Sequence, residues 1–277
     1  MARWWLISAL VCSGAFGAEP DTLDAAIKRM YDFNFSASQE ILTRYIEKHP
    51  QEPLPYAFRA SAYLFYELDR MSILESEFFT DDNRIAEKKK KIEPDPLVRT
   101  KFLAAVKDTE TRAEAALKAD PNDRQALFAM CIAQGVATDY MAFVEKRQIA
   151  SISVAKRSNG YAQRLMKLDP KFYDAYLTAG ISEYMIGSLP FFVRWFVKFE
   201  NIDGDKKRGV ERLELVAREG HYFRPFSKIL LATIALREKR PRDAQRFLQE
   251  LSRDYPENPL FRRELDKVSA KIGQAAN

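Results

Sequence analysis

One pattern constrains the fold of this chain more than any other: a helical stretch, then a proline beside Asn, Asp, Glu or Lys, then a new helical stretch. The pattern occurs four times, at Pro50, Pro121, Pro170 and Pro256. Proline lacks the amide N–H that a helix interior requires, so it ends one helix, and a second proline or an acidic residue beside it can begin the next. Before each proline, apolar residues recur at the three- and four-residue spacing of one helix face. The sequence therefore predicts an all-α fold.

The residues around these prolines resemble the tetratricopeptide repeat (TPR), a helix–turn–helix unit of ~34 residues with bulky, small and aromatic positions in a fixed order. The stretch 225–258 matches best, with Leu231 and Ala232 as its large–small pair and residues 240–244 as the turn between its helices. Small residues at such positions let two helices approach closely. The resemblance implies a right-handed TPR-like α-solenoid of about five helix pairs with insertions and a C-terminal closing helix. Together with the export signal described below, it suggests a TPR protein of the exported bacterial type.

The repeat divides the chain into units of unequal length. The expected units are 21–52, 53–123, 124–172, 173–222 and 225–258, followed by a closing helix at 260–272. Gly220 is expected to end a helix at the boundary between the last two units. Three units exceed one repeat length, and their extra residues fall between the two helices of each unit, at about 71–107, 139–153 and 188–203. Insertions of this kind typically form loops on one edge of a solenoid, which is often the binding edge.

Residues 1–18 have the pattern of a secretory signal peptide. A positive charge at Arg3 precedes an apolar run, and small residues lead to Ala18. The apolar stretch of roughly 13 residues falls short of the ~20 that span a bilayer. We therefore expect an exported protein, periplasmic or secreted. A retained anchor is one alternative. Lipidation at Cys12 is another, although Val11 stands before the cysteine where a lipoprotein signal has a small residue.

Composition and the absence of motifs argue against catalysis, metal binding and nucleic-acid binding. The chain has 19 Phe, 12 Tyr and 3 Trp but only 10 Gly, which disfavours phosphate-binding glycine loops. Two His, with Cys131 as the one cysteine outside the expected signal, are too few for a Cys/His zinc site, and the apolar setting of Cys131 indicates a core residue. The sequence holds no P-loop, dinucleotide, Gly-x-Ser-x-Gly or His-Glu-x-x-His motif. After loss of Arg3, 43 basic and 39 acidic residues favour no polyanion.

The positions that line the concave groove of TPR proteins are largely apolar in this chain. The candidate partner-binding residues are Phe65, Phe128, Ile132, Leu177, Ile181, Tyr184, Met185, Phe226 and Ile229. TPR grooves that grip charged peptide tails carry Lys, Arg and Asn at such places. An exposed apolar strip of this size is unusual for a soluble protein. Either the insertions fold over the groove, which we favour, or the groove binds a hydrophobic ligand.

The segment 188–199 is the most unusual local feature of the sequence. As a helix it presents one broad aromatic face made of Phe191, Phe192, Trp195, Phe196 and Phe199. The favoured interpretation is a helix packed back on the protein. The alternatives are a lid over an apolar ligand and an interfacial helix on a membrane surface. After this segment, Asp203 and Asp205 are expected to cap the helix that runs to Glu219.

These observations predict a non-enzymatic interaction scaffold of the cell envelope or secreted space, which binds a protein or peptide partner. The alternative is a TPR module that binds a hydrophobic small molecule or a lipid in its apolar groove, with residues 189–199 as a cover. We expect no cofactor, no metal and no nucleic-acid partner. If a membrane is involved, we expect surface contact and not integral insertion.

Overall fold

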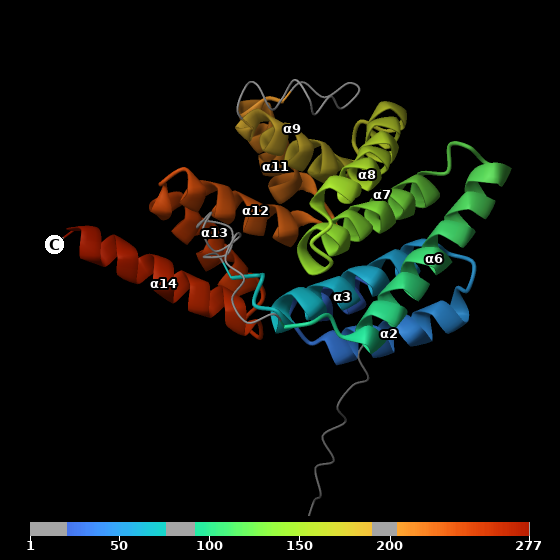
Figure 1. Cartoon of the computed structure of the whole chain (residues 1–277), viewed down its shortest axis with the longest axis horizontal. Helices are drawn as coiled ribbons and strands as arrows, with labels where there is room; N and C mark the ends of the chain where they lie inside the picture. The colour runs from blue at the N-terminus through green and yellow to red at the C-terminus, as the bar shows by residue number, and fades with distance from the viewer. Residues whose placement is uncertain (1–20, 76–91, 190–203, 277) are drawn as a thin grey trace, which may run out of the picture.

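The computed structural model describes residues 21–75, 92–189 and 204–276, and within these ranges it contains eleven α-helices and no β-strand (Figure 1). The helices are α1 (Leu23–Tyr31), α2 (Phe35–Lys48), α3 (Leu54–Arg70), α6 (Pro96–Ala119), α7 (Arg124–Asp139), α8 (Gln148–Leu168), α9 (Tyr176–Ser188), α11 (Lys206–Glu219), α12 (Arg224–Arg237), α13 (Pro241–Asp254) and α14 (Pro259–Ala276). The prediction of an all-α fold is confirmed. The expected signal peptide lies outside the described residues.

Helices that follow one another along the chain pack side by side (Figure 1). Extensive contacts join α7 to α8, α9 to α11, α12 to α13, α3 to α6 and α1 to α2, and α14 packs on α13. Each expected unit contains one of these pairs. The contact between α6 and α7, which belong to different expected units, is as extensive as that between α1 and α2. Helix α7 lies at the centre, where it contacts α3, α6 and α8.

Polar caps and prolines account for where these helices begin. The carboxylate of Asp95 accepts hydrogen bonds from the amides of Leu97 (2.8 Å) and Val98 (3.2 Å), and Pro96 occupies the first turn of α6. The Asp205 carboxylate accepts from the amide of Arg208 (3.1 Å) and caps α11, as expected. These caps satisfy amide groups that a helix leaves unpaired at its start. Asp203 lies outside the described residues.

Two of the expected insertions are partly helical, not loops. Helix α6 begins at Pro96, so its first three turns fall within the segment 71–107. A π-helix at Tyr140–Val144 continues α7 into the segment 139–153, and α8 begins four residues after it. A π-helical turn accommodates additional residues without ending a helix. Lengthened helices therefore take up much of the extra sequence. Most of the third segment, 188–203, lies outside the described residues.

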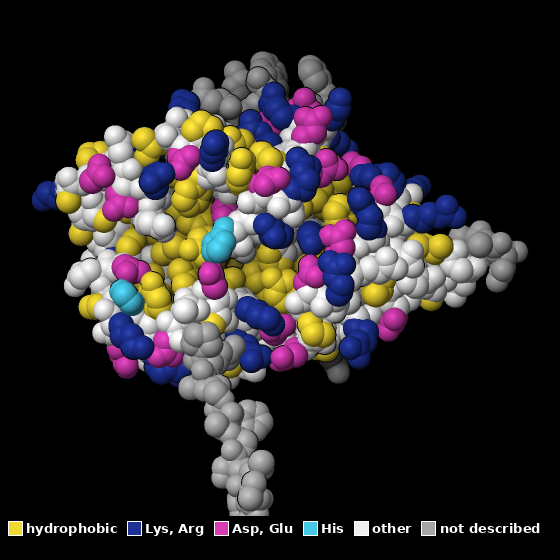
Figure 2. Space-filling model, turned by 180° about the vertical axis from the view of Figure 1, so that it is seen from behind, with side chains coloured by type: hydrophobic (Ala, Val, Ile, Leu, Met, Phe, Trp, Pro, Cys, Tyr) yellow, Lys and Arg dark blue, Asp and Glu magenta, His cyan; other side chains and the backbone are white. Residues whose placement is uncertain are grey.

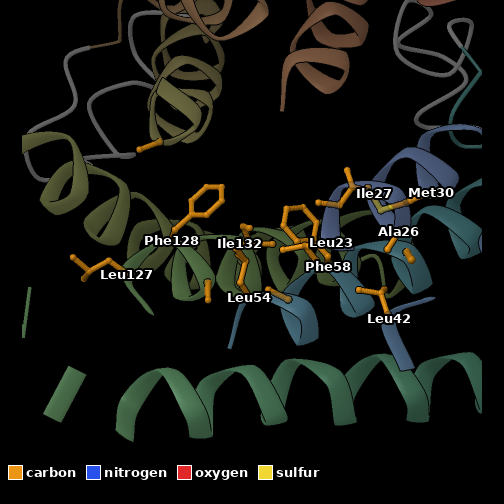
Figure 3. Packing of buried hydrophobic residues seen from close by; sticks show 14 of the residues in the cluster. Leu23, Ala26, Ile27, Met30, Leu42, Leu54, Phe58, Leu127, Phe128 and Ile132 are labelled. Carbon is orange, nitrogen blue, oxygen red and sulfur yellow. The ribbon is translucent and has the colours of Figure 1, made fainter. Parts of the chain in front are cut away.

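The largest cluster of buried apolar side chains joins the N-terminal helices to α7 (Figure 3). Figure 3 shows Leu54 and Phe58 of α3 facing Ile132 of α7, with Leu23 of α1 beside them. Burial of a large apolar side chain of this kind contributes roughly 1.5–3 kcal/mol. Cys131 is 2% exposed within α7, so its assignment to the core is confirmed.

The first helix also contacts turns near the C-terminal end of the chain. The Nδ2 group of Asn258 donates to the carbonyl of Tyr31 at 2.7 Å, and the Tyr31 hydroxyl donates to the carbonyl of Tyr222 at 3.2 Å. Arg29 and Glu257 form an ion pair at 2.9 Å. The start of α14 lies beside the end of α3 (Figure 1), and an ion pair at 3.3 Å joins Arg263 of α14 to Glu75, which follows α3. These contacts enclose the centre of the molecule.

Candidate functional site

A pocket of about 130 Å³ lies at the centre of the molecule, between α1, α3, α7, α8, α9 and the start of α12. We call it the central pocket. Most of its wall is apolar and comes from Met30, Tyr31, Leu64, Phe65, Ile132, Val136, Leu177, Ile181, Phe223 and Phe226. A cavity of about 150 Å³ with a similar apolar lining is large enough to bind benzene. The central pocket is therefore the right size for one ring or a short alkyl group.

The structure separates the nine expected groove residues into two sets. Five of them line the central pocket: Phe65, Ile132, Leu177, Ile181 and Phe226. The other four do not. Phe128 and Tyr184 are buried in apolar clusters, and Ile229 is half-buried against the α13–α14 cluster. Met185 is 59% exposed. The aromatic face predicted at Phe191, Phe192, Trp195, Phe196 and Phe199 lies outside the described residues.

Aromatic side chains from α1, α3 and α12 lie against one another on the wall of the central pocket. The rings of Tyr31 and Phe65 have centroids 6.2 Å apart, and those of Phe65 and Phe226 are 5.6 Å apart. Such tilted pairs are favourable ring arrangements. Met30 and Tyr31 of α1 therefore share the pocket wall with expected groove residues of α3 and α12. Residues 76–91 and 190–203 of the expected insertions lie outside the described residues, so whether they cover the groove stays a prediction.

Three of the hydroxyl groups on the pocket wall already donate their hydrogen atoms to backbone carbonyls. Ser61 donates to the carbonyl of Ala57 (3.0 Å), Thr138 to that of Gln134 (2.8 Å) and Ser158 to that of Cys131 (2.8 Å). A hydroxyl oxygen that donates still has lone pairs with which it can accept. These groups are therefore better suited to accept a hydrogen bond from a ligand than to donate one.

Asp139 lines the central pocket at the end of α7 and is partly accessible. Its carboxyl group forms no hydrogen bond or ion pair with another described residue. Burial raises the pKa of Asp139 to about 7, because protein surroundings disfavour the charged form. Among the described residues, no neighbouring charge contributes to this shift. A carboxyl group without a partner in a largely apolar pocket is the main chemical feature of the site.

The thiol of Cys131 also lines the pocket but has no features of a nucleophile. Burial raises the pKa of Cys131, and contacts with Thr178 and Ser158 oppose this shift only in part. A thiol whose pKa is raised is protonated at neutral pH and reacts slowly. We assign Cys131 to the pocket wall.

A second depression, of about 520 Å³, lies at the turn between α6 and α7. Its charged residues already have partners. Asp123 caps α7 through the amide of Ala126, and Arg124 pairs with Asp169 at 2.7 Å. These contacts explain the polar residues of this turn structurally.

The described residues offer no other site of known chemistry. No group of three or more His, Cys, Asp or Glu among them is placed to hold a metal ion. The described segment Arg124–Val144 is long and apolar enough to cross a membrane, with a mean hydropathy of 1.5. However, 61% of it is buried inside the molecule, as is typical of a central helix in a water-soluble fold.

Sequence reasoning missed Asp139 because it considered only the groove positions of each first helix. The signal was nevertheless present. Asp139 is the one acidic residue in the apolar stretch Arg124–Val144. An isolated acidic residue within such a stretch indicates either a buried ion pair or a functional carboxyl group.

The chain was compared with protein-family models, with curated proteins and with solved structures. None of the three comparisons finds a match. The resemblance to TPR proteins therefore stays a prediction based on the residues quoted above.

Proposed function

We propose that this chain is an exported TPR-like α-solenoid, periplasmic or secreted, that binds a small hydrophobic molecule in its central pocket without catalysing a reaction. The observation that carries this proposal is that five residues of the expected groove, from four different helices, line one apolar pocket. Pockets lined mainly by apolar side chains with a few polar groups are typical of small-molecule sites. The pocket volume favours a compact ligand over a long lipid chain.

Gly135 provides a direct test because it lies on the pocket wall. A Cβ atom added there would lie 3.5 Å from the Ser158 hydroxyl, which is ordinary contact. Gly135→Leu should therefore fill the pocket without disturbing the helix backbone. The matched control is Gly160→Leu, because Gly160 is exposed on α8 and an added Cβ would contact nothing within 4 Å.

The measurement is native mass spectrometry of the purified mature protein, with extraction of any bound molecule. We expect a bound small molecule in the wild type and in Gly160→Leu, and its loss in Gly135→Leu. A wild-type protein with no bound small molecule, and no binding of added toluene or benzyl alcohol by calorimetry, would contradict the proposal.

A protein partner is the second candidate function. Figure 2 shows hydrophobic side chains gathered across the middle of one face of the molecule, bordered by charged residues. Exposed apolar patches with a polar rim often mark protein interaction sites. The same mass spectra distinguish the two functions, because a protein partner would add the mass of a polypeptide.

A further inference from the structure

Among the described residues on the central-pocket wall, Asp139 is the one that can carry a charge at neutral pH. The described part of the wall contains no Lys, Arg, His or Glu. Its other titratable residues are Tyr31 and Cys131, and burial raises the pKa of both. Both side chains are therefore neutral at pH 7. The charge of the pocket is either zero or negative, depending on Asp139.

The carboxyl group of Asp139 also has no partner among the described residues. Carboxylates in protein interiors are normally paired or hydrogen-bonded, because an unpaired charge in such surroundings is costly. Other buried acidic residues here follow that rule: Glu183 forms ion pairs with Arg208 and Arg212, each at 3.0 Å. Asp139 has no such neighbour among the described residues. A bound cation would supply the missing partner of the Asp139 carboxylate.

The other groups on the pocket wall limit which class of cation could bind beside Asp139. Hydroxyl groups of Ser61, Thr138 and Ser158 are suited to accept hydrogen bonds, and an ammonium group is a donor with up to three N–H groups. A calcium or magnesium ion requires about six or more oxygen ligands, which conflicts with a largely apolar wall. A zinc ion usually requires three or four protein ligands, and no group of three or more His, Cys, Asp or Glu among the described residues is placed to hold a metal ion. A fatty acid or a phosphate group would place a second negative charge beside Asp139.

We propose that the ligand of the central pocket is a small hydrophobic amine, whose ammonium group pairs with the Asp139 carboxylate while its apolar part contacts the aromatic and aliphatic wall. This inference rests on the proposed function and specifies its ligand class. The pocket volume of about 130 Å³ accommodates an apolar part the size of one ring. An amine of this kind stays protonated well above pH 7, as a lysine side chain does.

The test uses three probes of similar size and different charge: benzylamine, benzyl alcohol and benzoate. Each is titrated by calorimetry into the mature protein at pH 8, where Asp139 is largely ionised. We expect benzylamine to bind about tenfold or more tightly than benzyl alcohol, and benzoate to bind weakest, since a charge-assisted hydrogen bond contributes about 1.5–3 kcal/mol.

The variant Asp139→Asn keeps the shape of the side chain and removes its charge. It should weaken benzylamine binding at least about tenfold and leave benzyl alcohol binding within about twofold. The control variant is Asp266→Asn, because Asp266 is exposed on α14 and distant from the pocket wall. Far-UV circular dichroism verifies that both variants are folded.

The two proposals fail in different ways. If benzyl alcohol binds as tightly as benzylamine and Asp139→Asn changes neither affinity, the pocket binds apolar molecules and the amine inference is wrong. If neither benzylamine nor benzyl alcohol binds the wild type, the proposed function fails and the amine inference fails with it.

Discussion

A carboxyl group that is surrounded by protein and lacks a partner destabilises the fold whenever it carries a charge. Asp139 is in this situation, and its pKa rises from the ordinary value of 3.8 to about 7. Between these values the folded state holds a proton that the unfolded state has lost. The free energy of unfolding should therefore fall as the pH rises from about 4 through 7.

Asp139→Asn should remove this part of the pH dependence. Because the side chain is partly accessible, we expect the wild type to lose only about 1–2 kcal/mol more than the variant between pH 5 and pH 8. Urea denaturation at the two pH values measures the difference. Parallel losses in the two proteins would show that the Asp139 carboxyl group is well solvated in the folded state.

Asp174 is buried more deeply than Asp139, and its carboxylate is held by backbone amides. It accepts hydrogen bonds from the amides of His221 (3.0 Å), Tyr222 (3.1 Å) and Phe223 (2.8 Å), which precede α12. Gly220 ends α11 at this place, as the sequence predicts, but with an extended backbone (φ −62°, ψ 147°). Steric crowding explains why this position is a glycine, because a Cβ would lie 2.6 Å from the carbonyl oxygen of Val216.

At the scale of elements, two glycines set the distance between α9 and α11. A Cβ on Gly209 would lie 2.6 Å from the amide nitrogen of Tyr184 and 2.8 Å from the carbonyl oxygen of Gly180. Both atoms belong to the backbone, so neither can move without shifting a helix. Gly180 takes part in the same close approach, because a Cβ there would lie 3.0 Å from the carbonyl oxygen of Gly209.

Gly209→Ala should therefore lower the free energy of unfolding by about 1–3 kcal/mol through overpacking, despite the better helix propensity of alanine. The control is Gly160→Ala, where an added Cβ contacts nothing within 4 Å. That change should stabilise the protein by about 0.5–1 kcal/mol. Thermal unfolding of both variants gives the comparison, and stabilisation by both would mean that the α9–α11 spacing adjusts freely.

The helix order could be predicted because its signals are local. A proline favours the start of a helix because it has no amide N–H that would be left unpaired there, and a capping carboxylate accepts hydrogen bonds from the amides of the next turn. The lengthened helices could not be predicted from repeat length, since nothing in a count of residues distinguishes a loop from three more turns.

One contact recurs at two of the proline boundaries. Arg112 donates to the carbonyl of Pro50 (2.6 Å), and Arg164 donates to that of Pro121. The unequal lengths of the units made this recurrence hard to recognise in the sequence.

At the scale of the whole molecule, the central pocket depends on contacts between distant parts of the chain. Tyr31 and Phe226 lie on its wall together, and the Tyr31 hydroxyl reaches a carbonyl 191 residues away. A repeat pattern describes how each pair packs on the next, but small differences in packing accumulate over several pairs. The contact of α1 with the C-terminal turns therefore could not be predicted from the sequence. The same holds for the central pocket, which depends on that contact.

Substitution of Asn258 tests whether the contact between α1 and the C-terminal turns holds the molecule together. Asn258 is 1% exposed, donates to the Tyr31 carbonyl, and accepts from the amide of Leu260 (2.9 Å) at the start of α14. In an open array, each helix pair contacts only its neighbours, so a defect near α14 would stay local. In the closed arrangement, Asn258→Ala should destabilise α1 as well, by about 1–3 kcal/mol.

Hydrogen exchange with mass spectrometry resolves the two cases. We expect Asn258→Ala to accelerate exchange in both Leu23–Tyr31 and Pro259–Ala276. Asn258→Asp should still accelerate exchange in Leu23–Tyr31, because it keeps the oxygen that accepts from Leu260 but replaces the donor to Tyr31 with a carboxylate oxygen. Asp205→Ala, which removes the cap of α11, should act on α11 and its neighbours and leave α1 unchanged. Faster exchange in α14 alone would mean that the two ends of the chain fold independently, and the central pocket would then lack the wall that α1 supplies.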